Sequence, residues 1–327
     1  KFDDFEKWVN DGFEGHELTP RPYQIETAFN IIRNKSCLAE LATSAGKSLI
    51  LYLVLAYLLK HDKAKKILMI VPNVSLVVQA TEDFYEYNRG SLDLQIQQIF
   101  AGSKIRNGSN VVVGTYQSLV KKKKEYFDDY STVMIDETHK AKATSIKKIL
   151  EKCQEADRVF GVSGTIPKPD SLDSLTLMAY TGPVIQRVTA AELIKQDYIS
   201  PVEVKVIEMN YAPETVKESF KFLTKTEEDR KRLLNLEQNY VIQDPTRLNF
   251  ITDTILKIGK NQLVLFYRVD YGKSIYDTLR NKSTRRVFYI DGGTDKNLRE
   301  EYKAQMEEGE DKILVASFGT FSTGINV

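Results

Sequence analysis

Short runs of β-branched and other apolar residues alternate with helical segments along most of this chain. Such alternation is typical of strand–helix–strand units, in which helices cover both faces of a parallel sheet. In the first half we expect strands at Cys37–Leu41, Lys66–Val71, Asn110–Thr115, Thr132–Ile135 and Arg158–Val162, and helices at Lys47–Lys60, Val74–Tyr87 and Thr144–Glu155. The composition of Cys37–Leu41 alone is only weakly typical of a strand. We predict that the first half forms one doubly wound α/β domain.

The pattern changes after Ser200-Pro201 and then resumes. An alternating stretch, 202–209, leads into a highly charged helical segment from Glu214 to about Gln243. Further strands are expected at Gln262–Tyr267, Arg286–Ile290 and Lys312–Ala316, and further helices at Gly272–Asn281 and Lys296–Glu308. We predict a first domain over residues 1–200, a linker with a charged helical insertion over 201–246, and a second, incomplete α/β domain over 247–327.

Composition excludes several classes of protein. The chain has 327 residues and a formal net charge of +1, so any nucleic-acid surface must be a local patch. Its two cysteines, Cys37 and Cys153, match no usual metal or redox spacing, and we expect buried thiols in a reducing compartment such as the cytoplasm. The longest apolar run, Leu49–Leu59, is shorter than the roughly 20 residues of a membrane-spanning helix. We interpret the start at Lys1 as a fragment boundary or processed end, and the end at Val327 as unusual for a compact domain.

The segment Leu41-Ala42-Thr43-Ser44-Ala45-Gly46-Lys47-Ser48 follows an expected strand and opens an apolar helix. This arrangement is typical of a phosphate-binding loop, whose backbone amides hold phosphate oxygens. Lys47 would neutralise the β and γ phosphates, and the Ser48 hydroxyl would bind magnesium. Leu41 stands where the general pattern has glycine. The loop by itself is therefore equally compatible with an ordinary strand-to-helix turn.

An acidic pair ends another expected strand, in the segment Met134-Ile135-Asp136-Glu137-Thr138-His139. The pair would lie at the carboxyl edge of the sheet, beside the loop. Asp136 suits magnesium binding, and Glu137 is placed to polarise the water that attacks the γ phosphate. For this pair alone, a helix N-terminus at which two acids interact with the helix dipole is the slightly favoured alternative.

Together these segments resemble those of the superfamily-two DExH-type helicases, with Asp136-Glu137-Thr138-His139 as the tetrad that gives the type its name. The resemblance implies two RecA-like domains with ATP and Mg²⁺ bound in the cleft between them. It also implies that Lys47, Asp136, Glu137 and His139 are catalytic and that Ser48 and Asp136 hold the metal. His139 would link hydrolysis to Ser163 or Thr165, although an ordinary histidine at a helix start remains the alternative.

Other motifs follow in the order that is typical of this family. Arg21-Pro22-Tyr23-Gln24 resembles the adenine-recognition segment, in which Gln24 would read the base edge and Tyr23 or Arg21 would pack on it. Two segments, Val71–Gln79 and Gly114–Ser118, resemble strand-contact motifs. The nucleic-acid contacts that they imply come from Ser75, Gln79, Thr115, Tyr116 and Gln117. Ser163-Gly164-Thr165 resembles the motif that couples hydrolysis to movement.

The resemblance continues into the second half. Leu263–Tyr267 with Arg268 resembles the strand that opens the second motor domain, and Ser317–Asn326 resembles the segment before the final motif. Within it, Gly324 and Asn326 would face the nucleotide. Two departures from the family are visible: Ser44 stands where the family usually has glycine, and no Gln-x-x-Gly-Arg-x-x-Arg segment follows Asn326. Because that segment supplies arginines to the γ phosphate in the family, we expect weak ATP hydrolysis by the 327-residue chain.

The function implied by the resemblance is that of an ATP-dependent DNA helicase or translocase. Its substrates would be forks, junctions and R-loops in recombination and repair, with DNA as the partner, RNA as a further partner in R-loops, no membrane, and a monomeric state. Two alternatives stay open. One is a duplex translocase or remodeller that does not separate strands, and the other is a nucleotide-gated clamp that binds nucleic acid without productive hydrolysis.

Two weaker signals have ordinary structural interpretations. The aromatic residues near the start, Phe2, Phe5, Trp8 and Phe13, could stack on bases, but packing against the first domain is the favoured interpretation. The run Lys121–Lys124 is as compatible with a solvated loop as with phosphate contacts.

Overall fold

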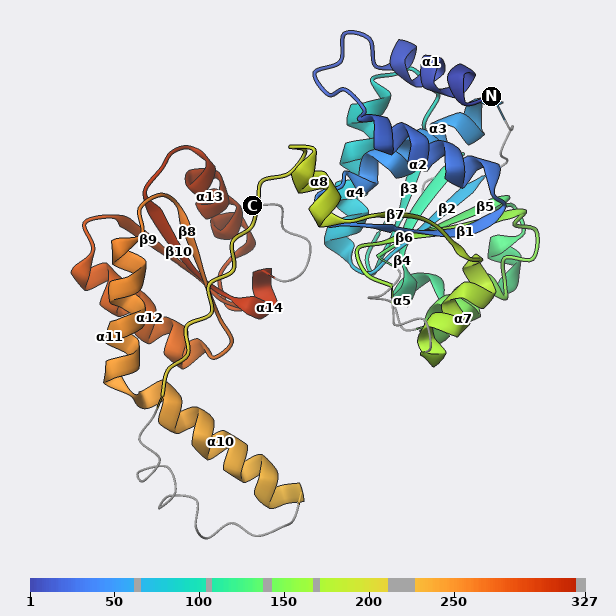
Figure 1. Cartoon of the computed structure of the whole chain (residues 1–327). Coiled ribbons are helices and arrows are strands. Elements are labelled where there is room, and N and C mark those ends of the chain that lie inside the picture. The colour runs from blue at the N-terminus through green and yellow to red at the C-terminus, as the bar shows by residue number, and fades with distance from the viewer. Residues whose placement is uncertain (62–65, 104–107, 138–142, 167–170, 211–226, 322–327) are drawn as a thin grey trace. The chain divides into compact units, whose positions relative to one another are not determined.

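A computed structural model describes residues 1–61, 66–103, 108–137, 143–166, 171–210 and 227–321 of the chain (Figure 1). The chain forms two compact units, Lys1–Glu203 and Val204–Val327. No helix in the described residues has the length and apolar character that crossing a membrane requires.

The first unit is built on a seven-stranded sheet in the order β3-β4-β2-β5-β6-β1-β7, with every pair of neighbours parallel. The strands are β1 (Ser36–Leu41), β2 (Ile67–Val71), β3 (Ile96–Ile99), β4 (Val111–Thr115), β5 (Thr132–Asp136), β6 (Arg158–Ser163) and β7 (Val184–Val188). All five strands expected in this half are present within a residue or two, including the weakly typical β1. The two edge strands, β3 and β7, were not predicted.

Helices cover both faces of this sheet, as the buried strands require (Figure 1). They are α1 (Phe2–Gly12), α2 (Pro22–Arg33), α3 (Lys47–His61), α4 (Val74–Asn88), α5 (Tyr116–Leu119), α6 (Ala143–Leu150), α7 (Leu172–Thr181) and α8 (Ala190–Lys195), with a short 3-10 helix, η1 (Lys124–Phe127). Strand β2 shows the two faces directly. Ile67, Met69 and Val71 belong to one apolar core, whereas Leu68 and Ile70 belong to the other.

The prediction of a helix from Thr144 to Glu155 is wrong at its C-terminal end, because α6 stops at Leu150. The Lys152 ammonium turns back to donate hydrogen bonds of 2.8 and 2.7 Å to the carbonyl oxygens of Val120 and Lys122. These contacts lie in the turn that follows α6, where the chain heads toward β6.

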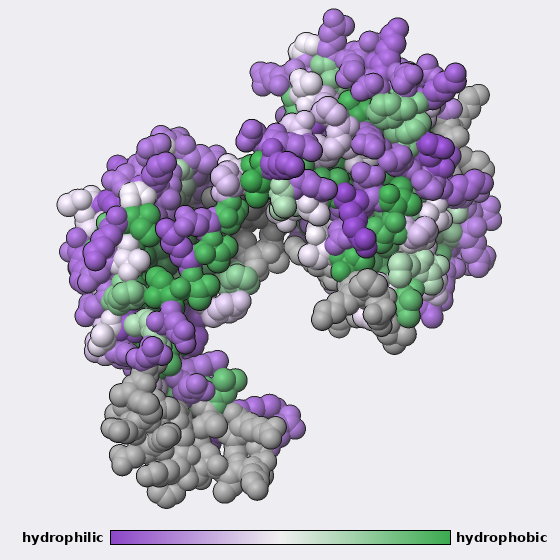
Figure 2. Space-filling model, in the orientation of Figure 1, coloured by the Kyte–Doolittle hydropathy of each residue, from purple (hydrophilic) through white to green (hydrophobic). Residues whose placement is uncertain are grey.

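The aromatic residues near the start pack against the first unit, as predicted. Phe5 is 2% exposed, and its ring lies 5.2 Å from Tyr57 and 5.7 Å from Trp8. The outer surface over α1 is mainly hydrophilic (Figure 2). The two cysteines are also buried as predicted, and burial raises the pKa of both the Cys37 and the Cys153 thiol to about 12.

The second unit contains a three-stranded parallel sheet in the order β8-β10-β9. Its strands are β8 (Gln262–Phe266), β9 (Arg286–Ile290) and β10 (Lys312–Ser317), and its helices are α10 (Glu227–Gln243), α11 (Pro245–Lys257), α12 (Val269–Lys282), α13 (Lys296–Glu307) and α14 (Phe318–Phe321). The three strands agree with the prediction, as does α13 to within one residue. Helix α12 begins three residues earlier than expected, and α11 was not predicted as a separate helix.

The alternating stretch 202–209 contains no helix or strand. Its valines are exposed, with Val202 at 76%, Val204 at 79% and Val206 at 88%. Of the predicted charged helical segment, residues 214–226 lie outside the described residues, and the remainder is α10, which has no buried apolar face among its described residues. The lack of such a face explains why charge, rather than periodicity, marked this segment in the sequence.

Candidate functional site

The segments that carry the predicted motifs of the first unit lie at one edge of its sheet. Because the strands are parallel, the carboxyl ends of β1, β2, β4, β5 and β6 point the same way. Register confirms the alignment, since Glu40 in β1 pairs with Ser163 in β6, and Asp136 in β5 pairs with Val162. The loop after β1 and the acidic pair after β5 are therefore separated by one strand, β6. In open α/β sheets, this edge is where ligands bind.

The loop between β1 and α3 contains two residues with a left-handed backbone conformation. Ser44 and Gly46 both have left-handed φ angles, of 65° and 70°. A Cβ atom on Gly46 would overlap the Gln24 side-chain amide, so no other residue fits there without displacing Gln24. Turns that combine right- and left-handed residues can gather backbone amides around an anion. The conformation of the loop is compatible with the predicted phosphate-binding role.

Ser44 keeps this shape at a steric cost, and this leads to a prediction about stability. Ser44→Gly is expected to raise the free energy of unfolding of the first unit by up to about 1 kcal/mol, because glycine adopts a positive φ without strain. Urea unfolding followed by the fluorescence of Trp8, the only tryptophan, measures this unit.

Ser36→Gly is the matched control for this prediction. Ser36 is an exposed residue of β1, outside the left-handed region. Glycine there should lower the free energy of unfolding by about 0.5–1 kcal/mol. If both substitutions destabilised the unit equally, the assigned backbone conformation at Ser44 would be wrong.

Lys47 lies next to the acidic pair. Its Nζ atom is 3.6 Å from Glu137 Oε1, and the two side chains are only 13% and 18% exposed. The same ammonium donates a hydrogen bond of 3.5 Å to the Ala42 carbonyl oxygen at the start of the loop. Gly164 lies alongside, because a Cβ atom there would be 3.8 Å from Lys47 Nζ. The structure therefore brings together the loop, the acidic pair and the Ser163-Gly164-Thr165 segment.

Asp136 and Glu137 offer two carboxylates at the end of β5. Asp136 Oδ1 accepts a hydrogen bond of 2.9 Å from the Glu137 amide, and Glu137 has a left-handed φ of 50°. Among the described residues, no three His, Cys, Asp or Glu side chains gather to form an all-protein metal site. Mg²⁺ usually binds through one or two carboxylates, substrate phosphates and water, so the donors here fit that ion when a triphosphate is bound.

The Ser48 side chain makes contacts with helix α4. Burial raises the pKa of Asp83, and a hydrogen bond with the Ser48 hydroxyl acts in the opposite direction. Burial also raises the pKa of Tyr87 to about 12, with the Asp83 and Glu86 charges adding to the effect and a Ser48 hydrogen bond opposing it. The predicted role of Ser48 as a magnesium ligand stays a prediction. Nothing in the sequence marked Asp83 or Tyr87 as its neighbours.

The upstream segment at the start of α2 is attached to the loop by side chains. Tyr23 and Gln24 donate hydrogen bonds of 2.9 and 3.1 Å to the same acceptor, the Ala45 carbonyl oxygen. The Gln24 side-chain oxygen Oε1 in turn accepts a hydrogen bond of 2.8 Å from the Arg21 backbone amide. The Arg21 guanidinium lies over the ring of Tyr198, 4.7 Å from its centroid. Tyr198 belongs to no recognisable motif and was missed in the sequence.

The two predicted strand-contact motifs also meet. Gln117, after β4, donates a hydrogen bond of 3.1 Å to the Pro72 carbonyl oxygen after β2. Thr115 is buried and its hydroxyl donates to Ser118 Oγ at 3.1 Å, whereas Ser75 is exposed at the start of α4. The half-buried residues of this set are Gln79 and Tyr116. Their predicted contacts with nucleic acid stay predictions.

The segment after β6 is held by a residue that was not predicted. Ser163 is buried and its hydroxyl donates to the Thr165 carbonyl oxygen at 2.7 Å. Just beyond, the Ile166 amide donates to Glu40 Oε1 at 3.4 Å, and Glu40 also pairs with Arg187 at 2.9 Å. A charged residue inside the apolar strand β1 was the available signal for Glu40. The predicted residues His139, Gly324 and Asn326 lie outside the described residues.

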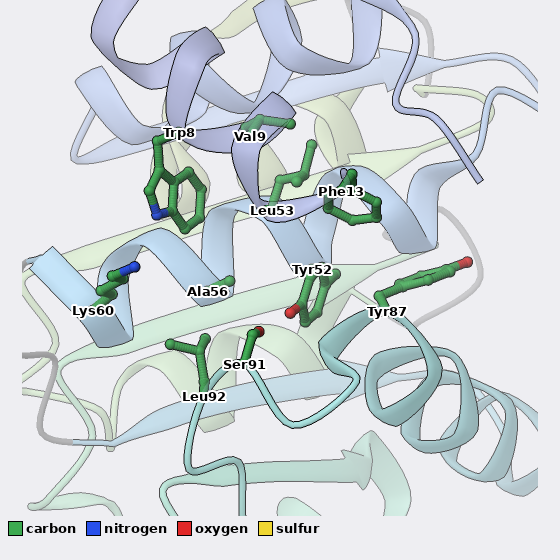
Figure 3. Close-up of a pocket in the computed structure, with 11 residues that line it drawn as sticks. Trp8, Val9, Phe13, Tyr52, Leu53, Ala56, Lys60, Tyr87, Ser91 and Leu92 are labelled. Carbon is green, nitrogen blue, oxygen red and sulfur yellow. The ribbon is translucent and has the colours of Figure 1, made fainter. Parts of the chain in front are cut away.

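A separate cavity between α1, α3 and the segment after α4 is not this site (Figure 3). Its volume is about 60 Å³, whereas ligand pockets usually measure roughly 300 Å³ or more. Its lining includes Trp8, Tyr52 and Leu92, and none of it comes from the loop after β1 or the acidic pair.

The chain is similar to one family profile and to several known proteins. The family profile described as "Type III restriction enzyme, res subunit" matches residues 17–168. The ATP-dependent DNA helicase UvsW of Enterobacteria phage T4 is 31% identical over 335 residues, which cover 99% of this chain and 64% of that protein. The chain thus spans a little under two thirds of UvsW. A crystal structure of T4 UvsW matches with a TM-score of 0.50 over 100% of this chain and 64% of that one.

Two more distant proteins are also similar to this chain. The DNA 3'-5' translocase XPB2 of Sulfurisphaera tokodaii is 22% identical, over 94% of this chain and 72% of that protein. Yeast Dbp5, in a structure bound to RNA and ADP BeF3, has a TM-score of 0.61 at 14% identity, over 99% of this chain and 77% of that one. The predicted RecA-like α/β fold is confirmed, with a smaller sheet in the second unit.

Proposed function

We propose that the chain is a superfamily-two DExH-type helicase and that it forms the ATP-dependent motor of a DNA helicase. The main support is the distance of 3.6 Å between Lys47 Nζ and Glu137 Oε1. A phosphate-loop lysine beside the acids that follow another strand is the arrangement that triphosphate hydrolysis needs. An ordinary strand-to-helix turn does not require it. UvsW, which bears the name of an ATP-dependent DNA helicase, matches over nearly the whole chain.

Each residue of the site has a proposed role. Amides of residues 43–48 hold the phosphates, and Lys47 neutralises their charge. Asp136, with Ser48, holds magnesium, and Glu137 orients and polarises the attacking water. Gln24 and Arg21 bind the base. Ser163 and Thr165 couple ATP hydrolysis to movement. Bound Mg-ATP supplies the phosphoanhydride bond whose cleavage drives movement.

The proposed substrate is branched DNA, such as forks, junctions and R-loops, in recombination and repair. Contacts to the strand come from Ser75, Gln79 and the segment Thr115–Gln117, near the point where Gln117 ties two loops together. The proposed domains are 1–200 and 247–327, joined by a linker and insertion over 201–246. We propose that the protein works as a monomer in the cytoplasm, which would be that of an infected bacterial cell, as for a phage relative.

A strand-separation assay tests this proposal. With ATP, this chain extended by an arginine-bearing final motif is expected to separate a labelled forked duplex and to hydrolyse ATP faster when DNA is present. The matched control omits ATP, and a blunt duplex of the same sequence measures the need for a branch. Displacement of a triplex strand without separation of the fork would instead identify a duplex translocase; XPB2 bears the name of a DNA 3'-5' translocase. DNA binding that depends on ATP without DNA-stimulated turnover would identify a clamp.

A further inference from the structure

Tyr198 stands at the centre of a cluster beside the phosphate loop. The Arg21 guanidinium lies 4.7 Å from the centroid of its ring, within the range of a cation–π contact. The Tyr23 ring lies 5.4 Å from the same ring, tilted by 48°. Tyr23 also donates its hydroxyl hydrogen to the Ala45 carbonyl oxygen of the loop. All three side chains are half-buried.

The position of Tyr198 is tied to the strand that carries the loop. Strand β7 pairs with β1 up to Val188, whose carbonyl oxygen accepts a hydrogen bond of 2.9 Å from the Ala42 amide. Helix α8 follows at once, with Thr189 as its N-cap in a capping box. Leu193 of this helix is 1% exposed, and its carbonyl oxygen accepts a bond of 2.9 Å from the Tyr198 amide. The backbone of Tyr198 is therefore fixed close to the packed core.

We infer that Tyr198 is a positioning residue for base recognition, acting through Arg21. The Arg21 guanidinium lies over the Tyr198 ring, so this contact restricts the position of the planar group. Held in this way, the guanidinium is ready to stack on a purine base, while Gln24 in the same segment lies against the loop. This inference rests on the proposed function, because it requires a nucleoside triphosphate in the loop. Tyr198 itself belongs to none of the motifs found in the sequence.

The physical effect of Tyr198 is to restrict Arg21 before the ligand arrives. A free arginine side chain loses rotamer entropy when it is immobilised by a ligand, and a pre-formed stack reduces that loss. An exposed cation–π contact is worth roughly 0.5–1 kcal/mol, which corresponds to a change of about two- to fivefold in affinity. The effect should be confined to ligands that have a base, since the phosphates are bound by other groups.

Calorimetric titration of the whole chain with ATP and with inorganic tripolyphosphate tests the inference. Tyr198→Ala is expected to weaken ATP binding about two- to fivefold and to leave tripolyphosphate binding unchanged. Tyr198→Phe keeps the ring and should bind both ligands like the original chain. The matched control is Tyr180→Ala, since Lys147 lies 5.9 Å from the centroid of the Tyr180 ring, away from the loop. That variant should change neither affinity.

A double-mutant cycle separates positioning from a general structural effect. If Tyr198 acts through Arg21, then Arg21→Ala combined with Tyr198→Ala should lose no more ATP affinity than Arg21→Ala alone. Additive losses, equal weakening of tripolyphosphate, or unchanged ATP affinity in Tyr198→Ala would each overturn the inference. If Lys47→Ala weakens both ligands while Tyr198→Ala changes nothing, only the role of Tyr198 fails. If the original chain binds neither ligand, the proposed function fails and the inference fails with it.

Discussion

Lys47→Ala is expected to abolish ATP turnover and to weaken ATP binding by about ten- to a thousandfold. Two unit charges about 4 Å apart interact by roughly 4 kcal/mol at an effective dielectric constant of 20, and a partly exposed site gives less. The Lys47 side chain is 13% exposed, so water screens its charge only in part. Phosphate release with and without DNA, together with calorimetric ATP binding, measures both quantities.

Lys60→Ala is the matched control, because Lys60 belongs to the same helix, α3, near its other end. Its ammonium lies 5.9 Å from the centroid of the Trp8 ring. Removal of this charge should leave ATP turnover and affinity unchanged. Turnover that survived Lys47→Ala would remove the basis for assigning a phosphate site to this loop.

Periodicity predicted most of the fold because the buried strands are continuous apolar runs. Five strands of the first sheet and all three of the second were expected, since each is bounded by polar or turn residues. The edge strands were not. Strand β3 contains Gln97 and Gln98 between its isoleucines, and β7 is half-exposed along most of its length, so neither resembles a buried parallel strand.

The site was predictable to the extent that parallel topology brings strand ends together. Once Lys47 and Glu137 follow strands of one parallel sheet, their proximity is a consequence of the fold. Contacts made by single side chains could not be predicted in this way. Tyr198 lies about 150 residues after the loop, and only the pairing of β7 with β1 brings it back. Likewise, the contacts of Ser48 with Asp83 and Tyr87 depend on how α3 packs on α4.

Glu137→Gln is expected to lower ATP turnover by about 10²- to 10⁴-fold, the usual contribution of a general base. Glutamine keeps the size of the side chain but cannot accept the proton of the attacking water. The control is Glu151→Gln, since Glu151 also pairs with a lysine, Lys147, at 3.8 Å but is half-exposed. Turnover by the control should be unchanged. A Glu137→Gln variant that still hydrolysed ATP at the original rate would show that another group activates the water.

Binding should respond to Glu137→Gln in the opposite sense to turnover. The carboxylate is 3.6 Å from Lys47 Nζ, so its charge competes with phosphate for the lysine. Neutral glutamine removes this competition and also removes a negative charge that would repel the triphosphate. ATP affinity should therefore be unchanged or higher, although turnover is lost, whereas Lys47→Ala should reduce both. A loss of ATP affinity in Glu137→Gln would mean that Glu137 supports the loop or holds the metal, and that its proposed role in activating water is wrong.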